Sequence, residues 1–213
     1  MPSTWALPVL LAEGGPFMPL ILITAFVGAV LAVERLLIWS AWRWRDRILY
    51  RATTRAALLL ALERETLRRP TPLGGVLLHA RTLMQQQVPL EAAQREEQLA
   101  PLILARMPVV EARLSTIAWI GGVLPMMGLL GTVSGLIATF NELAQTTSRQ
   151  VLSHGLSEAL WTTEVGLLGA LYLLAHHHLL SVWRDRWLNQ LECGVALLFS
   201  TGTKAQPEVR DEP

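Results

Sequence analysis

Charged residues are scarce in this sequence of 213 residues: only 16% are Asp, Glu, Lys or Arg, whereas 52% are hydrophobic. That balance is too apolar for an ordinary soluble domain of this size. The net charge of +1 provides no general attraction for nucleic acid. The single cysteine, Cys193, excludes an internal disulfide framework. We therefore expect a membrane protein that is neither stabilised by disulfides nor built to bind nucleic acid.

Formal charge is missing from two long stretches, Phe17–Val33 and the residues between Arg113 and Glu142. A third apolar segment, Leu156–Trp183, contains ionisable residues, among them Glu158 and Glu164. About 20 apolar residues suffice to cross a bilayer, so each segment predicts a transmembrane helix. No Lys or Arg precedes the first segment, and we interpret it as a spanning helix rather than a signal peptide.

Basic residues are absent from the first 16 positions and crowd into the segment between the first two spans. Most of the 18 Lys and Arg lie between Ser40 and Arg113, and only Arg149 lies between the second and third spans. The positive-inside rule then predicts an external N-terminus, a cytoplasmic loop and a cytoplasmic C-terminus. The predicted segments are an external N-terminal segment (1–15), TM helix 1 (16–39), a cytoplasmic helical loop (40–113), TM helix 2 (114–140), a short periplasmic turn (141–151), TM helix 3 (152–183) and a cytoplasmic C-terminal helix and tail (184–213).

The expected fold is an all-α membrane protein, with three transmembrane helices and long helices extending into the cytoplasm. In the loop, Ala56–Arg69 is rich in helix formers, and the prolines and glycines at 70–75 are expected to end that helix. A second loop helix is predicted to start at Pro89. We expect it to continue, with a kink, through Pro101 and Pro108 into the second span.

Two sequence motifs resemble those of one family. Residues 124–137 read LPMMGLLGTVSGLI, which is similar to the P-x-x-G-L-L-G-T-V-x-G-(M/L)-I motif of the MotA/TolQ/ExbB proton channel family. Residues 157–167 read SEALWTTEVGL, similar to the family's (S/A)-E-A-L-x-x-T-x-x-G-L. The first span ends in Glu34-Arg35-Leu36, like the family's E-R-L exit. Three spans with a long loop resemble the ExbB/TolQ branch more than the four-span MotA branch.

The glycines of the motif have a physical role of their own. Small residues three or four positions apart let helix backbones approach closely inside a membrane, where lipid supplies no hydrophobic drive between helices. We therefore predict a helix-packing motif, made by Pro125, Gly128, Gly131, Gly135 and Gly166.

The polar residues of the spans are the candidates for a proton path. On a projection at about 100° per residue, Glu158, Thr162 and Thr163 fall within one sector of about 140° of the third span. The resemblance implies that Thr132, Glu158 and Thr163 line the pore, and we add Thr162 because it shares the sector. Thr132 has two interpretations: a hydroxyl that bonds its own helix backbone, or one that faces the stripe of the third span and orders water.

Four further positions carry predictions of their own. Glu164 projects away from the sector, and we weigh a protonated, hydrogen-bonded structural role against a part in the proton path. His177 is an accessory candidate at the cytoplasmic end of the sector. Tyr172 stands where many members of the family have proline, which puts a local kink in doubt. Glu34 is interpreted as an interface pair with Arg35 or a contact to the loop helices.

No metal site is expected from the three consecutive histidines at 176–178, because neighbouring helical residues point about 100° apart and cannot converge on one ion. The sequence shows no nucleophile–base pair or phosphate-binding loop, so we expect neither an enzyme nor a cofactor. The resemblance implies a homo-oligomer, a pentamer, in the bilayer of the bacterial inner (cytoplasmic) membrane. It further implies an ExbD- or TolR-like single-span dimer in the pore, and a TonB- or TolA-like protein. The alternatives are a TolQ-like subunit for envelope integrity and a non-conducting membrane scaffold.

Overall fold

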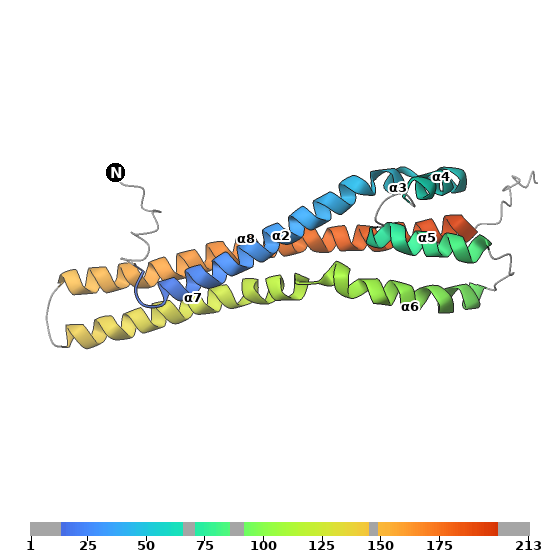
Figure 1. Ribbon diagram of the computed structural model, residues 1–213. Coiled ribbons are helices and arrows are strands. Elements are labelled where there is room, and N and C mark those ends of the chain that lie inside the picture. Colours follow the sequence, from blue (N-terminus) through green and yellow to red (C-terminus); the bar gives the residue numbers. More distant parts are fainter. Residues whose placement is uncertain (1–13, 66–70, 86–91, 145–148, 200–213) are drawn as a thin grey trace, which may run out of the picture. The chain divides into compact units, whose positions relative to one another are not determined.

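The computed structural model describes residues 14–65, 71–85, 92–144 and 149–199 (Figure 1). Within them the regular structure is helical throughout, which confirms the predicted all-α fold. The helices are α2 (Met18–Arg45), α3 (Arg47–Arg51), α4 (Arg55–Glu65), α5 (Pro72–Gln85), α6 (Ala92–Glu111), α7 (Leu114–Leu143) and α8 (Arg149–Phe199).

Three helical stretches of the described residues are long and apolar enough to cross a membrane: Met18–Arg45, Leu99–Leu143 and Leu152–Phe199. Each contains one of the charge-poor segments of the sequence. Helix α2 continues beyond Trp39, and α8 continues beyond Trp183, because neither exit contains a proline or a glycine that would end a helix. The N-terminal segment up to residue 13 and the tail from residue 200 lie outside the described residues.

The prediction for the prolines and glycines at 70–75 was wrong in part. These residues start a helix, since Pro72 is the first residue of α5 and Gly74 and Gly75 lie inside it. Proline suits a first helical position because its fixed φ is helical and its missing N–H would have no partner there. Thr71 caps the helix, its Oγ1 accepting a hydrogen bond of 3.1 Å from the Gly74 N–H. Helix α5 was therefore missed.

The expected kinked continuity between the second loop helix and the second span is confirmed in part, because Leu99–Leu143 is one helical stretch that is interrupted by a turn at residues 112–113. Pro101 and Pro108 lie inside α6, and the chain breaks after them, at Arg113, whose φ is 66°. A left-handed residue cannot continue a right-handed helix, so α7 starts at the next position. The predicted start at Pro89 lies outside the described residues.

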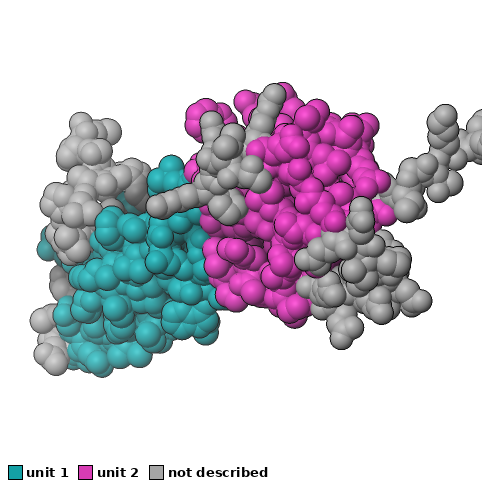
Figure 2. All heavy atoms as spheres, turned by 45° about the vertical axis from the view of Figure 1, so that its right-hand side comes forward, with its two compact units in different colours: residues 1–39, 111–183 teal, residues 40–110, 184–213 magenta. Residues whose placement is uncertain are grey.

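The chain divides into two compact units, which Figure 2 distinguishes by colour: residues 1–39 with 111–183, and residues 40–110 with 184–213. In the first unit, α2, α7 and α8 share a core. A Cβ on Gly28 of α2 would lie 2.6 Å from Leu173 of α8 and 3.1 Å from Ile120 of α7. Leu173 is fully buried. The three spanning segments therefore pack on one another at a glycine of the first.

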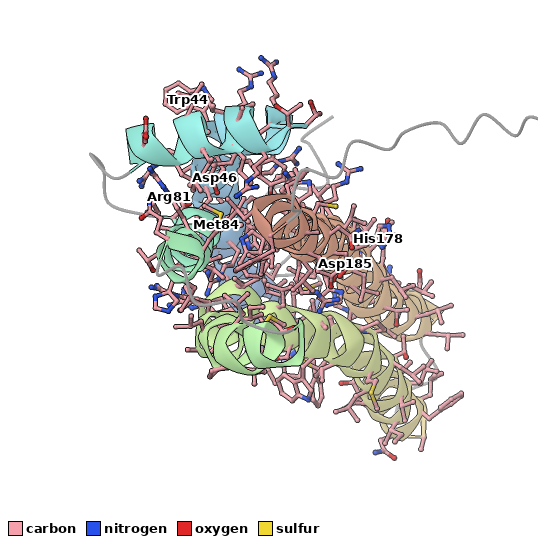
Figure 3. All side chains as sticks on the ribbon, turned by 90° about the vertical axis from the view of Figure 1, so that its right-hand side faces the viewer. Trp44, Asp46, Arg81, Met84, His178 and Asp185 are labelled. Carbon is pink, nitrogen blue, oxygen red and sulfur yellow. The ribbon has the colours of Figure 1, made fainter. Side chains whose placement is uncertain are left out.

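The second unit has its own apolar core, to which α3, α4, α5 and the last part of α8 contribute. Leu77 of α5 packs against Gly194 of α8, where a Cβ would lie 2.7 Å from the leucine side chain. Side-chain contacts join α4 to α5: Arg81 pairs with Glu63 at 3.1 Å, and Arg55 donates to the Met84 sulfur at 3.2 Å. Figure 3 labels Arg81 and Met84 of α5. The fully buried side chains of this core include Leu49, Leu58, Leu62, Leu73 and Leu77.

A buried polar pair lies in the second unit beside that core. The Thr71 hydroxyl donates a hydrogen bond of 2.6 Å to Asp46 Oδ1, and both residues are 2% exposed. Burial raises the pKa of the nearby Tyr50 to about 12; the negative charge of Asp46 adds to the rise and Arg43 opposes it. Asp46 thus anchors the start of α5 to the end of α2.

Candidate functional site

Helices α7 and α8 meet backbone to backbone at two glycines. A Cβ on Gly166 would lie 2.8 Å from the carbonyl oxygen of Leu124, and a Cβ on Gly128 would lie 2.9 Å from that of Thr162. Real Cβ atoms do not come so close to a backbone atom, so any larger residue would push the helices apart. Gly131 and Gly135 continue the contact along α7, against Thr162 and Ala159.

The contact extends toward the C-terminal end of α7 and the N-terminal end of α8. Thr139 is 4% exposed, and its hydroxyl donates a hydrogen bond of 2.8 Å to the Gly135 carbonyl. A Cβ on Gly155 of α8 would collide with that hydroxyl. Small residues therefore line this face of both helices over several turns, as the spacing of the glycines in the sequence indicates.

The Gly128 carbonyl is the focus of two threonine hydroxyls from α8. Thr163 Oγ1 donates to it at 3.0 Å. Thr162 Oγ1 lies 3.4 Å from it and makes a shorter bond, 2.7 Å, to the Ala159 carbonyl of its own helix. A hydroxyl in an apolar span needs an internal partner, since lipid offers none. The hydrogen bonds of both threonines thus lie in the α7–α8 contact.

Exposure separates the two threonines. Thr162 is 2% exposed and belongs to the packed contact of the single chain, whereas Thr163 is half-buried, at the edge of that contact. Thr163 is thus the one of the two whose side chain also reaches the surface of the protomer. A pore-lining role for either threonine stays a prediction.

Thr132 makes the local bond that was one of its two interpretations. Its hydroxyl donates to the Leu129 carbonyl of α7 at 2.6 Å. Because the residue is half-buried rather than buried, its side chain keeps a free approach from the surface. The second interpretation placed Thr132 opposite the polar stripe of α8. Among the described residues, Thr132 makes no hydrogen bond to that helix.

Glu158 lies half-buried where α8 passes the start of α2. Its carboxyl group packs against the backbone of Gly15, so that a Cβ on that glycine would collide with it. Glu158 also lines a small cavity of about 50 Å³, together with Ser134 and Thr162. The contact of Gly15 with Glu158 was not predicted, although the Gly-Gly-Pro before the span is a turn signal.

Glu164 is exposed on the surface of α8 and lies outside the α7–α8 contact. His177 is half-buried, and its neighbour His176 contacts the Tyr172 carbonyl at 2.8 Å through Nδ1. Helix α8 continues without interruption through Tyr172. Among the described residues no group of three or more His, Cys, Asp or Glu is placed to hold a metal ion.

An ion pair joins helix α2 to the residue that directly precedes α7. Glu34 forms an ion pair with Arg113, the residue with left-handed backbone. Of the two interpretations of Glu34, this ion pair favours the contact to the loop, since Arg113 is the last residue of the predicted loop. Nothing in the local sequence signals this pairing, because it depends on how the helices pack.

The glycine contact and the polar residues of α7 and α8 lie within a stretch that matches a protein-family model. The model of the MotA/TolQ/ExbB proton channel family matches residues 76–193, more than half of the chain. The chain belongs to this family. The match includes the glycine contact, Thr132, Glu158, Thr162 and Thr163.

Individual relatives point to the ExbB branch of the family. The chain is 47% identical over 76 residues to the biopolymer transport protein exbB1 of Vibrio cholerae, a stretch that covers 34% of this chain and 33% of that protein. It is 42% identical over 57 residues to the biopolymer transport protein ExbB of Salmonella typhimurium, covering 26% and 23%. The matched stretches thus span a third or less of these curated relatives. Together with the three apolar helices, the similarity indicates a multi-pass inner-membrane protein.

Proposed function

We propose that this chain is the proton-channel (stator) subunit of an ExbB–ExbD-like inner-membrane motor that uses the proton motive force to energise TonB-dependent outer-membrane transport. Family membership and the identity with ExbB proteins support the proposal. The observation that carries it is Thr163, a half-buried residue at the edge of the α7–α8 contact whose hydroxyl is bonded to the Gly128 carbonyl. A hydroxyl so placed can accept and pass a hydrogen bond to water without leaving its own partner.

In the proposed assembly, a homo-pentamer surrounds the single helices of an ExbD-like dimer, and a TonB-like protein receives the work. Thr132, Thr163 and Glu158 are the polar groups around a proton-carrying aspartate of that partner, and Thr162 supports Thr163 from the packed side. Each proton that crosses yields about 2.3 kcal/mol per 100 mV, so several protons suffice for one mechanical step. The chain itself performs no enzymatic reaction.

The orientation follows from the distribution of charge. The basic residues of 40–113 are proposed to lie in the cytoplasm with the C-terminus, and the N-terminus in the periplasm. Glu158 then lies toward the periplasmic end of α8, and His177 toward the cytoplasmic end.

Glu164 is proposed to be covered in the assembly by a second copy or by the partner. A charged carboxylate at the lipid-facing surface of a spanning helix costs several kcal/mol, and Glu164 is exposed in the single chain. A neutral, hydrogen-bonded carboxylic acid at a subunit contact avoids that cost. Glu164 is therefore proposed as an accessory group with a structural role, and His177 is also proposed as an accessory group. The alternative for Glu164 is a direct role in the proton path. Glu164→Gln is expected to keep both assembly and proton flux; intact assembly with abolished flux would show that Glu164 transfers protons.

Proton flux into proteoliposomes tests the main proposal. The chain is co-purified with the single-span protein encoded beside it, and flux is followed with a pH-sensitive dye under an imposed potential. Thr163→Val is expected to lower flux about tenfold, equivalent to about 1.4 kcal/mol, whereas Thr163→Ser retains it. Thr24→Val is the matched control, because Thr24 of α2 bonds only the Leu20 carbonyl of its own helix. Undiminished flux in Thr163→Val would remove Thr163 from the path, and no flux in the wild-type complex would favour a non-conducting scaffold.

Complementation separates ExbB-like from TolQ-like work. Rescue of TonB-dependent uptake in a strain that lacks ExbB and TolQ would support the proposal. Rescue of envelope integrity alone would replace it with the TolQ-like role.

A further inference from the structure

The cavity beside Glu158 is lined by polar groups from both motif helices. Glu158 and Thr162 come from α8, and Ser134 comes from α7. The turn that precedes α2 supplies Gly14, Pro16 and Phe17, and small residues of α7 complete the wall: Gly131, Gly135 and Ala138. Its volume is about 50 Å³, which is more than the 10–15 Å³ or so that one ordered water requires.

The polar groups of this cavity are short of partners. Among the described residues, neither the Glu158 carboxylate nor the Ser134 hydroxyl has a hydrogen-bond partner. A half-buried carboxylate without a partner is unfavourable, because desolvation is not compensated. Thr162 Oγ1 donates to the Ala159 carbonyl, which leaves its lone pairs free to accept. One water can therefore bond three groups, as buried waters usually do.

The turn before α2 is shaped to admit the carboxyl group. Gly15 has a φ of 64°, and a side chain there would collide with the Glu158 carboxyl. Only glycine satisfies both conditions without strain. The turn is held to the helix start by the Met18 N–H, which donates to the Gly15 carbonyl at 3.2 Å.

We infer that this cavity is a water-binding site inside the single protomer, in which Ser134 and Thr162 hold ordered water against the Glu158 carboxylate. One chain supplies all the described walls of the site. It requires neither a partner nor a proton gradient. Glu158 is hydrated from within its own subunit, and Ser134 acts as a positioning residue for that water.

High-resolution cryo-electron microscopy of the chain in nanodiscs tests the inference directly. The expected result is density for water within hydrogen-bond distance of both the Glu158 carboxylate and the Ser134 hydroxyl. Ser134→Val fills the space and removes the donor, so that density is expected to disappear. Ser115→Val, on the exposed face of α7, is the matched control and is expected to retain it. An empty cavity in the wild type, or a lipid or detergent chain in it, would overturn the inference.

Radiolytic footprinting provides a second measurement that does not depend on a structure of the variant. Radicals formed from a bound water label side chains next to it, and the ring of Phe17 lines the cavity. Ser134→Val is expected to lower Phe17 labelling about fivefold and Ser134→Ala about twofold, because alanine leaves the space but removes one of the water's partners. Ser115→Val should leave it unchanged. Equal labelling in wild type and Ser134→Val would show that Phe17 is hydrated from elsewhere and would contradict the site. If the wild-type complex conducts no protons but its Phe17 is labelled as expected, that result would count against the proposed function only.

Discussion

The hydroxyl of Thr163 donates a hydrogen bond of 3.0 Å to the carbonyl oxygen of Gly128, and so joins the two motif helices of the family where their backbones pack closely. The glycine is required for two reasons. It lets α8 come within reach, and it exposes the backbone oxygen that the threonine uses.

Removal of this hydrogen bond should weaken the α7–α8 contact modestly. Thr163→Val is expected to lower the free energy of unfolding by about 0.6 kcal/mol, and by no more than about 1.7 kcal/mol, the range for interhelical bonds in membranes. Thr163→Ser should be close to wild type. Unfolding in mixed SDS and dodecyl maltoside micelles measures the difference. An equal loss in Thr24→Val, which removes only a local bond, would show that the interhelical bond adds nothing.

A methyl group at Gly166 should separate the same helices. Gly166→Ala places a Cβ 2.8 Å from the Leu124 carbonyl oxygen, and overpacking of this kind destabilises by about 1–3 kcal/mol. Gly122→Ala is the matched control on α7, because a Cβ there meets nothing within 4 Å. The control should be neutral or stabilised by up to about 1 kcal/mol through helix propensity. Equal stability of the two variants in the micelle assay would contradict the close contact.

The ion pair between Glu34 and Arg113 should contribute little by itself. Its side chains are 40% and 45% exposed, and pairs of that kind contribute about 0.2–1 kcal/mol. A double-mutant cycle with Glu34→Gln and Arg113→Gln measures the coupling, which should shrink at high salt. Arg113→Gly should recover about 1 kcal/mol of the strain of a left-handed residue. A coupling that does not change with salt would indicate a buried pair instead.

The Thr71 hydroxyl should contribute substantially to the stability of the second unit. Thr71→Val removes the hydrogen bond to the buried Asp46 carboxylate and the cap on Gly74, so a loss of about 1–3 kcal/mol is expected. Thr71→Ser keeps both bonds and should be near wild type. Thr82→Val is the control, because the exposed Thr82 bonds only the His79 carbonyl of its own helix. Thermal unfolding in detergent compares the three, and a loss in Thr82→Val as large as that in Thr71→Val would refute the assignment.

Tyr50 should lose its proton at a higher pH than an ordinary tyrosine. Its pKa is raised to about 12 by burial and by the charge of Asp46, whereas an unfolded tyrosine ionises near pH 10. Between about pH 10 and pH 12 the unfolded state therefore binds fewer protons than the folded state, and stability should fall as the pH rises through that window. The difference in tyrosinate absorbance between wild type and Tyr50→Phe isolates this residue from the second tyrosine. A midpoint near pH 10 in the folded protein would disprove it.

The spans and motifs were predictable because they depend on local composition. A charge-free run of sufficient length predicts a spanning helix whatever surrounds it, as between Arg113 and Glu142. The glycine spacing likewise indicated a close helix contact. Errors arose where a local signal is ambiguous. Proline both ends and starts helices, so Pro72 was assigned to a break, although it opens α5.

The sequence by itself determined that this chain is an all-helical membrane protein of the MotA/TolQ/ExbB family, because hydropathy and motif residues are properties of short segments. Only the tertiary structure decided the partners of individual polar groups. It pairs Thr163 with Gly128, Glu34 with Arg113, and Thr71 with Asp46. Each pair joins residues far apart in the chain, so its formation depends on the three-dimensional packing of helices, which no local pattern encodes.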